Sequence, residues 1–287
     1  MSGQVLILGG SGRIGRYSTR AFEEAGWKVR QFDRKNENMA EAAKGCDVII
    51  NGLNPPNYHD WETLLPQITE TVVDAARKSG ATVILPGNVY HFGDQGGLWS
   101  EQTPPNSVSR KGAVRLRIER DYRDSGVQTI VLRAGNFIDP EARSCIMALI
   151  YLRAIKNGKI TLPGPAETRQ AMCFLGDWAR AAVQLAEKRP TLAPFEDIPF
   201  PGHTLTGHDI KKAAETALGH KLTFTKFPWW MFTLTAPVWE LAREMKEMRY
   251  LYETDHALSD KRLKALLPDF EATPIEQIIR DMLAARD

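Results

Sequence analysis

The 287-residue chain has few of the features that mark a secreted, nucleic-acid-binding or membrane protein. Its three cysteines, Cys46, Cys145 and Cys173, are far apart in the sequence and lie in apolar surroundings. An odd, dispersed set excludes a disulfide framework and indicates buried thiols in a reducing compartment. The formal net charge is only +2, so no basic excess points to a nucleic acid or a membrane surface as a partner.

Long apolar runs are also missing. The most apolar late segment, PWWMFTLTAPVW at 228–239, is too short to span a bilayer and contains Pro237. We also expect no signal peptide before the first expected strand. We therefore expect a cytoplasmic protein with no membrane and no nucleic acid among its partners. The histidines lack metal-ligand spacing, so no metal is expected.

The chain does have a glycine-rich turn directly after its first apolar run. Residues 5–8 predict a short buried strand, and the glycines then fall at Gly9, Gly12 and Gly15, with an extra Gly10. Such a turn lets the backbone approach a pyrophosphate, and the helix that follows offers free N–H groups and the positive end of its dipole. In this strand–turn–helix context the spacing predicts a dinucleotide cofactor.

The second expected strand, 28–32, ends at Asp33, Arg34 and Lys35. An acidic residue about 20 positions past the glycines binds ribose hydroxyls and favours NAD, whereas a basic residue favours the 2′-phosphate of NADP. Arg13 in the turn could also reach a phosphate, so the sequence leaves NAD and NADP open. The residues expected to contact the cofactor are Gly9, Gly10, Ser11, Gly12, Arg13, Ile14, Gly15, Asp33, Arg34, Asn51, Gly52, Leu53 and Arg115.

Strands and helices alternate through the first half of the chain. Strands are expected at 5–8, 28–32, 47–51, 82–85 and 129–132, with helices at 39–44, 63–79 and 110–125 between them. This alternation predicts an α/β fold with a doubly wound parallel sheet, whose ligand lies beyond the carboxyl ends of the strands.

Helices dominate the expected second half. They are placed at 145–157, at 178–188 with Asp177 as N-cap, and at a helix ending at Leu218 that is capped by Thr206 or His208 and stopped by Gly219. Two more are expected at 238–252 and 274–285. We expect 1–138 and 171–200 to form a cofactor domain, and 139–170 and 201–287 a smaller, mostly helical substrate lobe.

Several stretches, in this order, resemble the extended short-chain dehydrogenase/reductase family, the epimerase/dehydratase group. They are GGSGRIG at 9–15, Asn88-Val89-Tyr90, the segment 101–104, LRAGNFIDP at 132–140, FLGDWARA at 174–181, and LSDKRLKALLPDFEATPIEQ at 258–277. The resemblance implies a Rossmann domain that binds NAD or NADP and a C-terminal lobe that closes over a small-molecule substrate. It also makes a homodimer through helices 63–79 and 110–125 plausible.

The departure from the family lies at the active site. The family pair Tyr-x-x-x-Lys falls on Lys111 and Arg115, and the usual serine position falls near 86–88, where no hydroxyl side chain exists. Isoflavone reductase and phenylcoumaran ether reductase-like proteins carry a similar Lys-x-x-x-Arg pattern, with the lysine as proposed acid/base. This resemblance implies that role for Lys111.

Lys111, Arg115 and Glu119 lie on one helical face, because they are spaced i, i+4, i+8. One interpretation is a solvated face with a supporting Arg115–Glu119 pair. The other places Lys111 beside the nicotinamide, where burial and the nearby Arg115 favour a neutral amine that exchanges a proton with a substrate oxygen.

Other candidate site residues follow the expected strands or lie in the second lobe. Tyr90 and His91 could replace the missing hydroxyl as catalytic donors or be structural. The residues expected to contact substrate are Asn88, Asn136, Trp229 and Trp230. The aromatic cluster around the two tryptophans is either core or the wall of an apolar pocket.

Three functions follow from these patterns. The leading one is an NAD(P)-dependent oxidoreductase acting on a carbonyl or alcohol, with an apolar or aromatic substrate as one option. The alternatives are a nucleotide-sugar epimerase or dehydratase and a non-catalytic NAD(P)H-binding sensor or scaffold.

Overall fold

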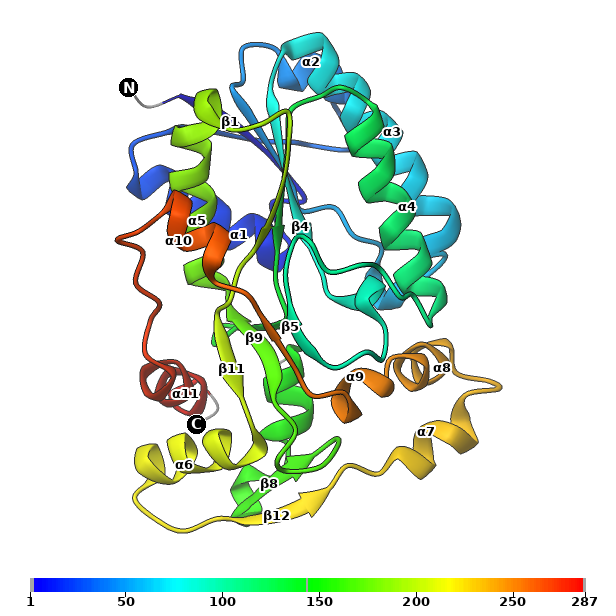
Figure 1. Ribbon diagram of the computed structural model, residues 1–287, viewed down its shortest axis with the longest axis vertical. Coiled ribbons are helices and arrows are strands. Elements are labelled where there is room, and N and C mark those ends of the chain that lie inside the picture. The colour runs from blue at the N-terminus through cyan, green and yellow to red at the C-terminus, as the bar shows by residue number, and fades with distance from the viewer. Residues whose placement is uncertain (1–2, 143, 286–287) are drawn as a thin grey trace.

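A six-stranded parallel sheet forms the centre of the computed structural model, which describes residues 3–142 and 144–285 (Figure 1). Its strand order is β10-β6-β4-β3-β1-β2, and every neighbouring pair is parallel. The strands are β1 (Gln4–Leu8), β2 (Lys28–Gln31), β3 (Val48–Asn51), β4 (Thr82–Gly87), β6 (Thr129–Arg133) and β10 (Phe195–Pro199). This order confirms the predicted doubly wound α/β fold of Rossmann type.

Helices cover both faces of this sheet, as the apolar runs of its strands require. The helices α1 (Arg13–Glu24) and α5 (Leu175–Lys188) pack on one face, and α2 (Met39–Ala43), α3 (Trp61–Ser79) and α4 (Arg110–Asp124) on the other (Figure 1). Successive residues of β1 supply the two cores: Val5 joins the cluster under α1 and α5, and Leu6 the cluster under α2 and α3. Both side chains are fully buried.

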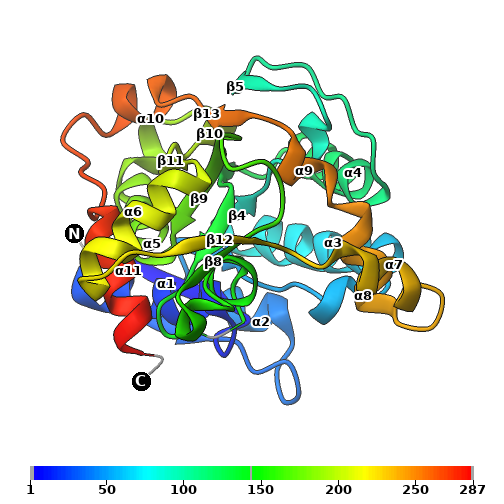
Figure 2. The ribbon, with the colours of Figure 1, turned by 90° about the horizontal axis from the view of Figure 1, so that it is seen from below.

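The other strands form small sheets below the large one in the view of Figure 1, and Figure 2 shows them from that side. One sheet joins β7 (Asn136–Ile138), β9 (Gln170–Phe174) and β11 (His203–Leu205); two pairs join β8 (Lys159–Leu162) to β12 (Thr223–Lys226) and β5 (Gly97–Trp99) to β13 (His256–Leu258). The helices of this part are α6 (Gly207–Leu218), α7 (Trp229–Thr235), α8 (Glu240–Glu247), α9 (Tyr250–Glu253) and α11 (Ile275–Ala284), whereas α10 (Lys261–Leu266) packs against β10 of the large sheet. The proposed division into 1–138 with 171–200 and 139–170 with 201–287 stays a prediction.

The open choice of cap for α6 is resolved by the structure. The hydroxyl of Thr206 accepts a hydrogen bond from the backbone N–H of Asp209 at 3.2 Å, and the Asp209 carboxylate accepts one from the Thr206 N–H, which makes a capping box. Gly219 ends the helix with φ +73°, a conformation that favours glycine.

Three expectations for the second half were wrong. The helix expected at 145–157 is two short helical segments, Met147–Tyr151 and Ile155–Asn157, and the helix expected at 238–252 is broken between α8 and α9. Asp177 is not the N-cap of α5, which begins earlier. The Asp177 carboxylate instead accepts bonds from the backbone N–H and hydroxyl of Thr273 at 2.9 and 2.7 Å, so a tertiary contact takes the place of the local cap.

One buried cation, Arg133 at the end of β6, joins three elements of the fold. Its guanidinium is fully buried and donates to Glu119 of α4 at 2.8 and 3.1 Å and to Asp197 of β10 at 2.7 and 3.0 Å. It also donates to the Asn88 carbonyl, in the loop after β4, at 2.6 Å. Burial opposes the charge, but the attraction of Glu119 and Asp197 outweighs it and raises the pKa of Arg133 above its usual value.

The network around Arg133 predicts a large cost for removing it. Arg133→Met leaves two carboxylates without their cation, and breaking a buried pair in this way costs about 3–5 kcal/mol of unfolding free energy. Urea unfolding followed by tryptophan fluorescence measures the loss. The matched control is Arg120→Met on the exposed side of α4, which should stay within about 0.5 kcal/mol of the parent chain. Equal stability of the two variants would contradict the assigned role of Arg133.

Candidate functional site

The turn between β1 and α1 presents an open helix N-terminus. Gly9 has φ +73°, and its carbonyl accepts a bond from the Gly12 N–H at 2.9 Å, which folds the turn. Gly12 is the N-cap of α1, no side chain caps it, and the first helical turn has no acidic residue. Ser11 and Arg13 are exposed beside it. This geometry leaves backbone N–H groups and the positive end of the helix dipole available to a phosphate.

Close backbone packing explains why glycines occupy this turn. A Cβ atom at Gly15 would overlap the Gly9 carbonyl oxygen and lie 2.6 Å from the Cα of Gly10. A Cβ at Gly52, in the loop after β3, would lie 2.7 Å from the Leu8 carbonyl oxygen. The first turn of α1 and the β3 loop can therefore approach the end of β1 only without side chains at these positions. The arrangement fits a dinucleotide whose diphosphate lies on this turn.

The other expected cofactor residues lie at the same edge of the sheet. Asp33, just after β2, is exposed, and its carboxylate accepts bonds from the Lys35 N–H at 2.9 Å and the Asn36 amide at 2.6 Å, which lower its pKa. Arg34 is exposed next to it. Asn51 donates to the Tyr122 hydroxyl at 3.0 Å, so part of its side chain holds the fold.

Two more expected cofactor residues lie in the glycine turn and the β3 loop. Ile14 and Leu53 are half-buried, and the backbone N–H of Leu53 donates to the Asn51 side-chain oxygen at 3.2 Å. The carboxylate and the cations after β2 are both present, so the choice between NAD and NADP remains a proposal.

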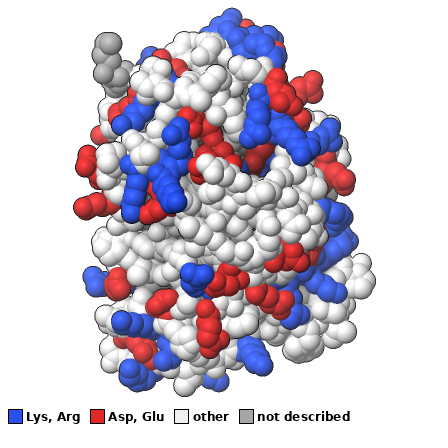
Figure 3. Space-filling model, viewed as in Figure 1, with Lys and Arg blue, Asp and Glu red and all other residues white. Residues whose placement is uncertain are grey.

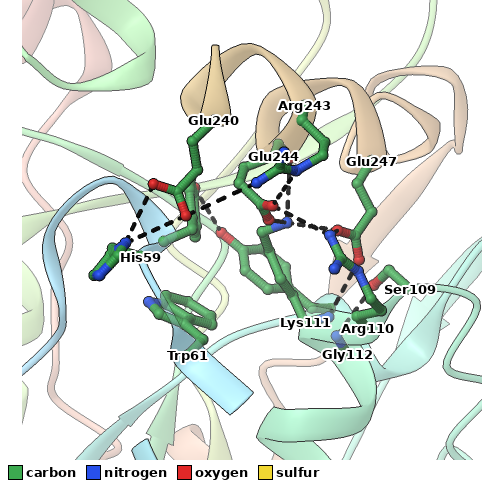
Figure 4. Close-up of polar contacts among 12 residues, drawn as sticks. His59, Trp61, Ser109, Arg110, Lys111, Gly112, Glu240, Arg243, Glu244 and Glu247 are labelled. Atoms are coloured by element: carbon green, nitrogen blue, oxygen red, sulfur yellow. Dashed lines mark hydrogen bonds and ion pairs between the residues drawn. The ribbon is translucent and has the colours of Figure 1, made fainter. Parts of the chain in front are cut away.

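Lys111, in the first turn of α4, is buried against α8 (Figure 4). Its ammonium donates to a carboxylate oxygen of Glu247 at 2.7 Å, pairs with the Glu244 carboxylate, and donates to the Glu244 backbone carbonyl at 3.3 Å. The same nitrogen lies 5.1 Å from the centre of the Tyr58 ring. Since an ammonium has three hydrogens, these acceptors use all of its donors. The solvated helix face was therefore the wrong interpretation at this position.

The other two charged residues of that helical face, Arg115 and Glu119, contact different partners. The Arg115 guanidinium stacks on the Trp61 ring with 4.7 Å between guanidinium carbon and ring centre, and donates to the Asn54 side-chain oxygen at 3.1 Å. Glu119 pairs with Arg133 rather than with Arg115, so the expected Arg115–Glu119 pair was wrong. Arg115 thus contacts the loop after β3, whose residues Gly52 and Leu53 were also expected to contact the cofactor.

Tyr90 and His91, one residue apart, contact different groups. The Tyr90 hydroxyl lies 3.4 Å from the Tyr58 hydroxyl, and burial raises its pKa well above the usual value. The His91 Nδ1 lies 3.2 Å from an Arg133 nitrogen; burial and then the Arg133 charge lower the pKa of His91 to about 3. His91 is therefore neutral near pH 7, and Nδ1 is assigned as the acceptor from Arg133. Tyr90 contacts Tyr58, which also contacts Lys111, whereas His91 belongs to the Arg133 network.

Sequence reasoning missed Tyr58, which lies in the loop 52–60 before α3. Tyr58 lies between Lys111 and Tyr90, and its ring packs against Trp61 with 5.0 Å between ring centres. Asn57, Tyr58 and Asp60 have φ of +55°, +63° and +42°, a left-handed conformation that costs energy in non-glycine residues and is concentrated at functional sites. The polar residues and the tyrosine that follow the third strand were the only sequence signal that could have pointed to Tyr58.

The expected substrate residues do not all come together. Asn88 accepts a bond from the Tyr90 N–H at 3.0 Å, and Asn136 is half-buried in β7. The Trp229 indole donates to the Pro163 carbonyl at 2.7 Å and packs against Tyr252. Trp230 is 66% exposed, on the outer side of α7. Trp229 therefore contributes to packing in the second half of the chain, whereas Trp230 faces outward.

The described residues contain neither a metal-binding cluster nor a membrane-spanning helix. No group of three or more histidine, cysteine or acidic side chains within 3–142 and 144–285 could hold a metal ion. Over the same ranges, no helix is both long and apolar enough to cross a membrane.

Known structures share this architecture. UDP-glucuronic acid 4-epimerase from Bacillus cereus, in complex with UDP-glucuronic acid and NAD, has a TM-score of 0.75 and 13% identity over 98% of both chains. MoeE5 in complex with UDP-glucuronic acid and NAD has the same TM-score and identity over 99% of both chains. RMD from Pseudomonas aeruginosa, complexed with NADPH, has a TM-score of 0.73 and 14% identity over 99% of both. At these identities the likeness shows the fold alone.

The sequence itself gives the family. No curated protein matches the chain. The family model described as the NAD dependent epimerase/dehydratase family matches residues 5–198, which include the glycine turn, Lys111 and Arg133. That range covers well over half of the chain, and the match confirms the resemblance to the epimerase/dehydratase group that the sequence motifs indicated. The chain belongs to the NAD-dependent epimerase/dehydratase family.

Proposed function

We propose that this chain binds NAD or NADP at the turn between β1 and α1 and catalyses a redox step at a hydroxyl or carbonyl carbon of a small molecule. The observation that carries the proposal is the approach of Gly15 to Gly9, which leaves the N-terminus of α1 uncapped and open to a diphosphate. A bound nicotinamide supplies the hydride donor or acceptor. The chain holds the diphosphate, positions the ribose near Asp33 and handles the substrate proton.

A nucleotide sugar is the substrate class that we favour. The family is named for epimerases and dehydratases, and the printed names of two similar structures include UDP-glucuronic acid. An apolar or aromatic substrate has less support, because Trp230 is turned outward and Trp229 is held by Pro163. The exposed Arg169 is a cation that could meet a nucleotide phosphate, and it pairs with Asp255 at 2.6 Å. A substrate phosphate would have to compete with that carboxylate.

Lys111 remains the proposed acid/base residue, with Tyr90 beside it. All three Lys111 donors are occupied, so a substrate oxygen must replace one acceptor before the lysine can exchange a proton with it. Glu247 is the acceptor most open to replacement, since its side chain is 17% exposed against 9% for Glu244. Substrate binding is thus coupled to a shift of α8.

A non-catalytic NAD(P)H-binding protein is the second candidate. Two observations favour it: the chain lacks a hydroxyl side chain at 86–88, and the Lys111 ammonium is saturated by its own protein. This alternative expects cofactor binding without turnover on any nucleotide sugar or carbonyl compound.

Separate titrations with NADH and NADPH, followed by nicotinamide fluorescence, test the cofactor site. The parent chain should bind one or both, and Gly15→Ala should abolish binding, because the added methyl group forces α1 away from the end of β1. Glu23→Ala, exposed at the far end of the same helix, is the control and should bind as the parent does. Failure of the parent to bind either nucleotide would overturn the proposal.

The role of Lys111 can be separated from its structural pairing. Once a panel of UDP- and GDP-sugars has identified a substrate, Lys111→Met should lower the rate by about 100-fold or more, the scale of acid–base catalysis. It should also destabilise the fold, because Glu244 and Glu247 lose their buried cation and keep only the exposed Arg110 and Arg243.

A triple variant separates the catalytic role of Lys111 from its role in stability. Lys111→Met with Glu244→Gln and Glu247→Gln removes all three charges together and should regain stability but not rate. If the rate returns with the stability, measured by thermal unfolding, then Lys111 is a structural anchor and not the acid/base residue.

A further inference from the structure

Tyr58, in the loop between β3 and α3, lies between the candidate catalytic residues Lys111 and Tyr90. We propose that the Tyr58 hydroxyl donates a hydrogen bond to the substrate oxygen at which the redox step takes place, beside Lys111 as the acid/base residue. This inference rests on the function proposed above and adds to it the residue that holds the reacting oxygen.

Tyr58 faces residues from both halves of the molecule. Its ring centre lies 5.1 Å from the Lys111 ammonium, and its hydroxyl lies 3.4 Å from the Tyr90 hydroxyl. On the side of the second half, burial first, then Tyr151 and Tyr58, raise the pKa of Tyr252 well above its usual value. Because small-molecule sites form preferentially where two parts of a chain meet, a substrate held between the two halves would contact Tyr58.

The loop that carries Tyr58 begins beside the glycine turn. A Cβ atom on Gly9 would lie 2.9 Å from the Gly52 carbonyl oxygen, so the start of the loop is packed against the expected diphosphate site. Further along the loop, the Asn54 side-chain oxygen accepts a hydrogen bond from Arg115 at 3.1 Å. The loop leaves the carboxyl end of β3, the edge of a parallel sheet at which ligands bind. Tyr58 therefore follows directly after the segment expected to contact the cofactor.

The Tyr58 hydroxyl can donate to a substrate oxygen without loss of an ion pair. The hydroxyls of Tyr58 and Tyr90 carry two hydrogens, and the contact between them uses one, so Tyr58 keeps a free donor when Tyr90 donates to it. Their separation is also long for two hydroxyls, which are usually about 2.7–2.8 Å apart, so a better acceptor easily replaces the contact. Tyr58 is half-buried, whereas Lys111 is only 3% exposed.

A local positive charge favours an oxyanion beside Tyr58. The Lys111 ammonium over the ring attracts the ring face, and its charge would stabilise an oxygen that becomes negative while bound to the phenol. Burial and then Tyr58 raise the pKa of Tyr90 well above its usual value, so the Tyr90 hydroxyl keeps its proton near pH 7. Basic and acidic side chains are interspersed over the face of the molecule in Figure 3, so no patch of one sign there would hold a substrate by charge alone. Individual donors must hold the reacting oxygen.

The backbone at Tyr58 has a costly conformation. Its φ of +63° is left-handed, which a tyrosine rarely adopts, and Asn57 and Asp60 share this conformation. The next residue is held from outside the loop, since the His59 ring lies 3.2 Å from a carboxylate oxygen of Glu240 in α8 (Figure 4). Backbone strain of this kind is concentrated at functional sites, which supports a role for Tyr58 beyond packing.

The variant Tyr58→Phe tests the hydroxyl alone, because it retains the ring that packs against Trp61 and faces Lys111. The parent chain is first assayed with NADH and NADPH on a panel of UDP-sugars, GDP-sugars and carbonyl compounds. With the substrate so identified, Tyr58→Phe should lower kcat by about 100-fold, the scale of one lost donor to an oxyanion. Its affinity for the nicotinamide nucleotide and its thermal unfolding midpoint should equal those of the parent.

The matched control is Tyr250→Phe, a phenol nearby whose hydroxyl already contacts the protein. That hydroxyl donates to the Tyr90 backbone carbonyl at 3.2 Å and lies 3.3 Å from the Ser109 hydroxyl. The control variant should therefore retain the parent kcat, whatever its stability.

The results distinguish failure of this inference from failure of the function on which it rests. Turnover by the parent reports on the function, and the ratio of kcat between the parent and Tyr58→Phe reports on Tyr58. An unchanged kcat in Tyr58→Phe would overturn the role of Tyr58 and leave the function standing. A kcat that falls only together with nucleotide affinity or unfolding midpoint would make Tyr58 a packing residue and also overturn it. A parent that binds NADH or NADPH but converts nothing in the panel would overturn both.

Discussion

The close approach of the first turn of α1 to the end of β1 is the constraint on which the site depends. Gly15 has no room for a Cβ atom beside Gly9, and Gly52 has none beside Leu8. The absence of these two Cβ atoms lets the start of α1, the end of β1 and the β3 loop come together at one edge of the sheet. No side chain caps the helix, so its dipole and N–H groups face outward instead of being satisfied by the protein. The turn is suited to a phosphate because its glycines lack side chains, rather than because it carries a particular polar residue.

Around that edge, α4 joins the two halves of the molecule through buried charge. Near its end it contributes Glu119 to Arg133, and at its start it contributes Lys111 to the carboxylates of α8. A buried charge is costly unless it is paired, so each of these groups fixes where its partner element must lie. The loop after β4 is held in the same way, because Arg133 binds the Asn88 carbonyl and contacts His91. The residues expected to be catalytic are therefore supported by a framework of ions as much as by apolar packing.

The sequence was sufficient to predict those features of the structure that depend on residues close together in the chain. The glycine turn, five of the six strands of the large sheet and the end of α6 at Gly219 are local features, and their bounds were predicted to within a few residues. The sequence could not supply partners that lie far along the chain. Nothing near Lys111 indicates that Glu244 and Glu247 will take its donors, and nothing near Asp177 indicates that Thr273 will take its carboxylate. Tyr58 was missed for the same reason, because its meaning comes from Lys111 and Tyr90 and not from its own neighbours.

The helix α8 divides its charged side chains between two directions within little more than one turn. Glu244 and Glu247 pair with Lys111, and Glu247 also lines, together with Arg243 and Lys246, a groove between the start of α4 and α8. A rotation of this short helix about its own axis would withdraw the carboxylates and the cations together. Any displacement of α8 would therefore alter the groove and the pairing of the Lys111 ammonium at the same time.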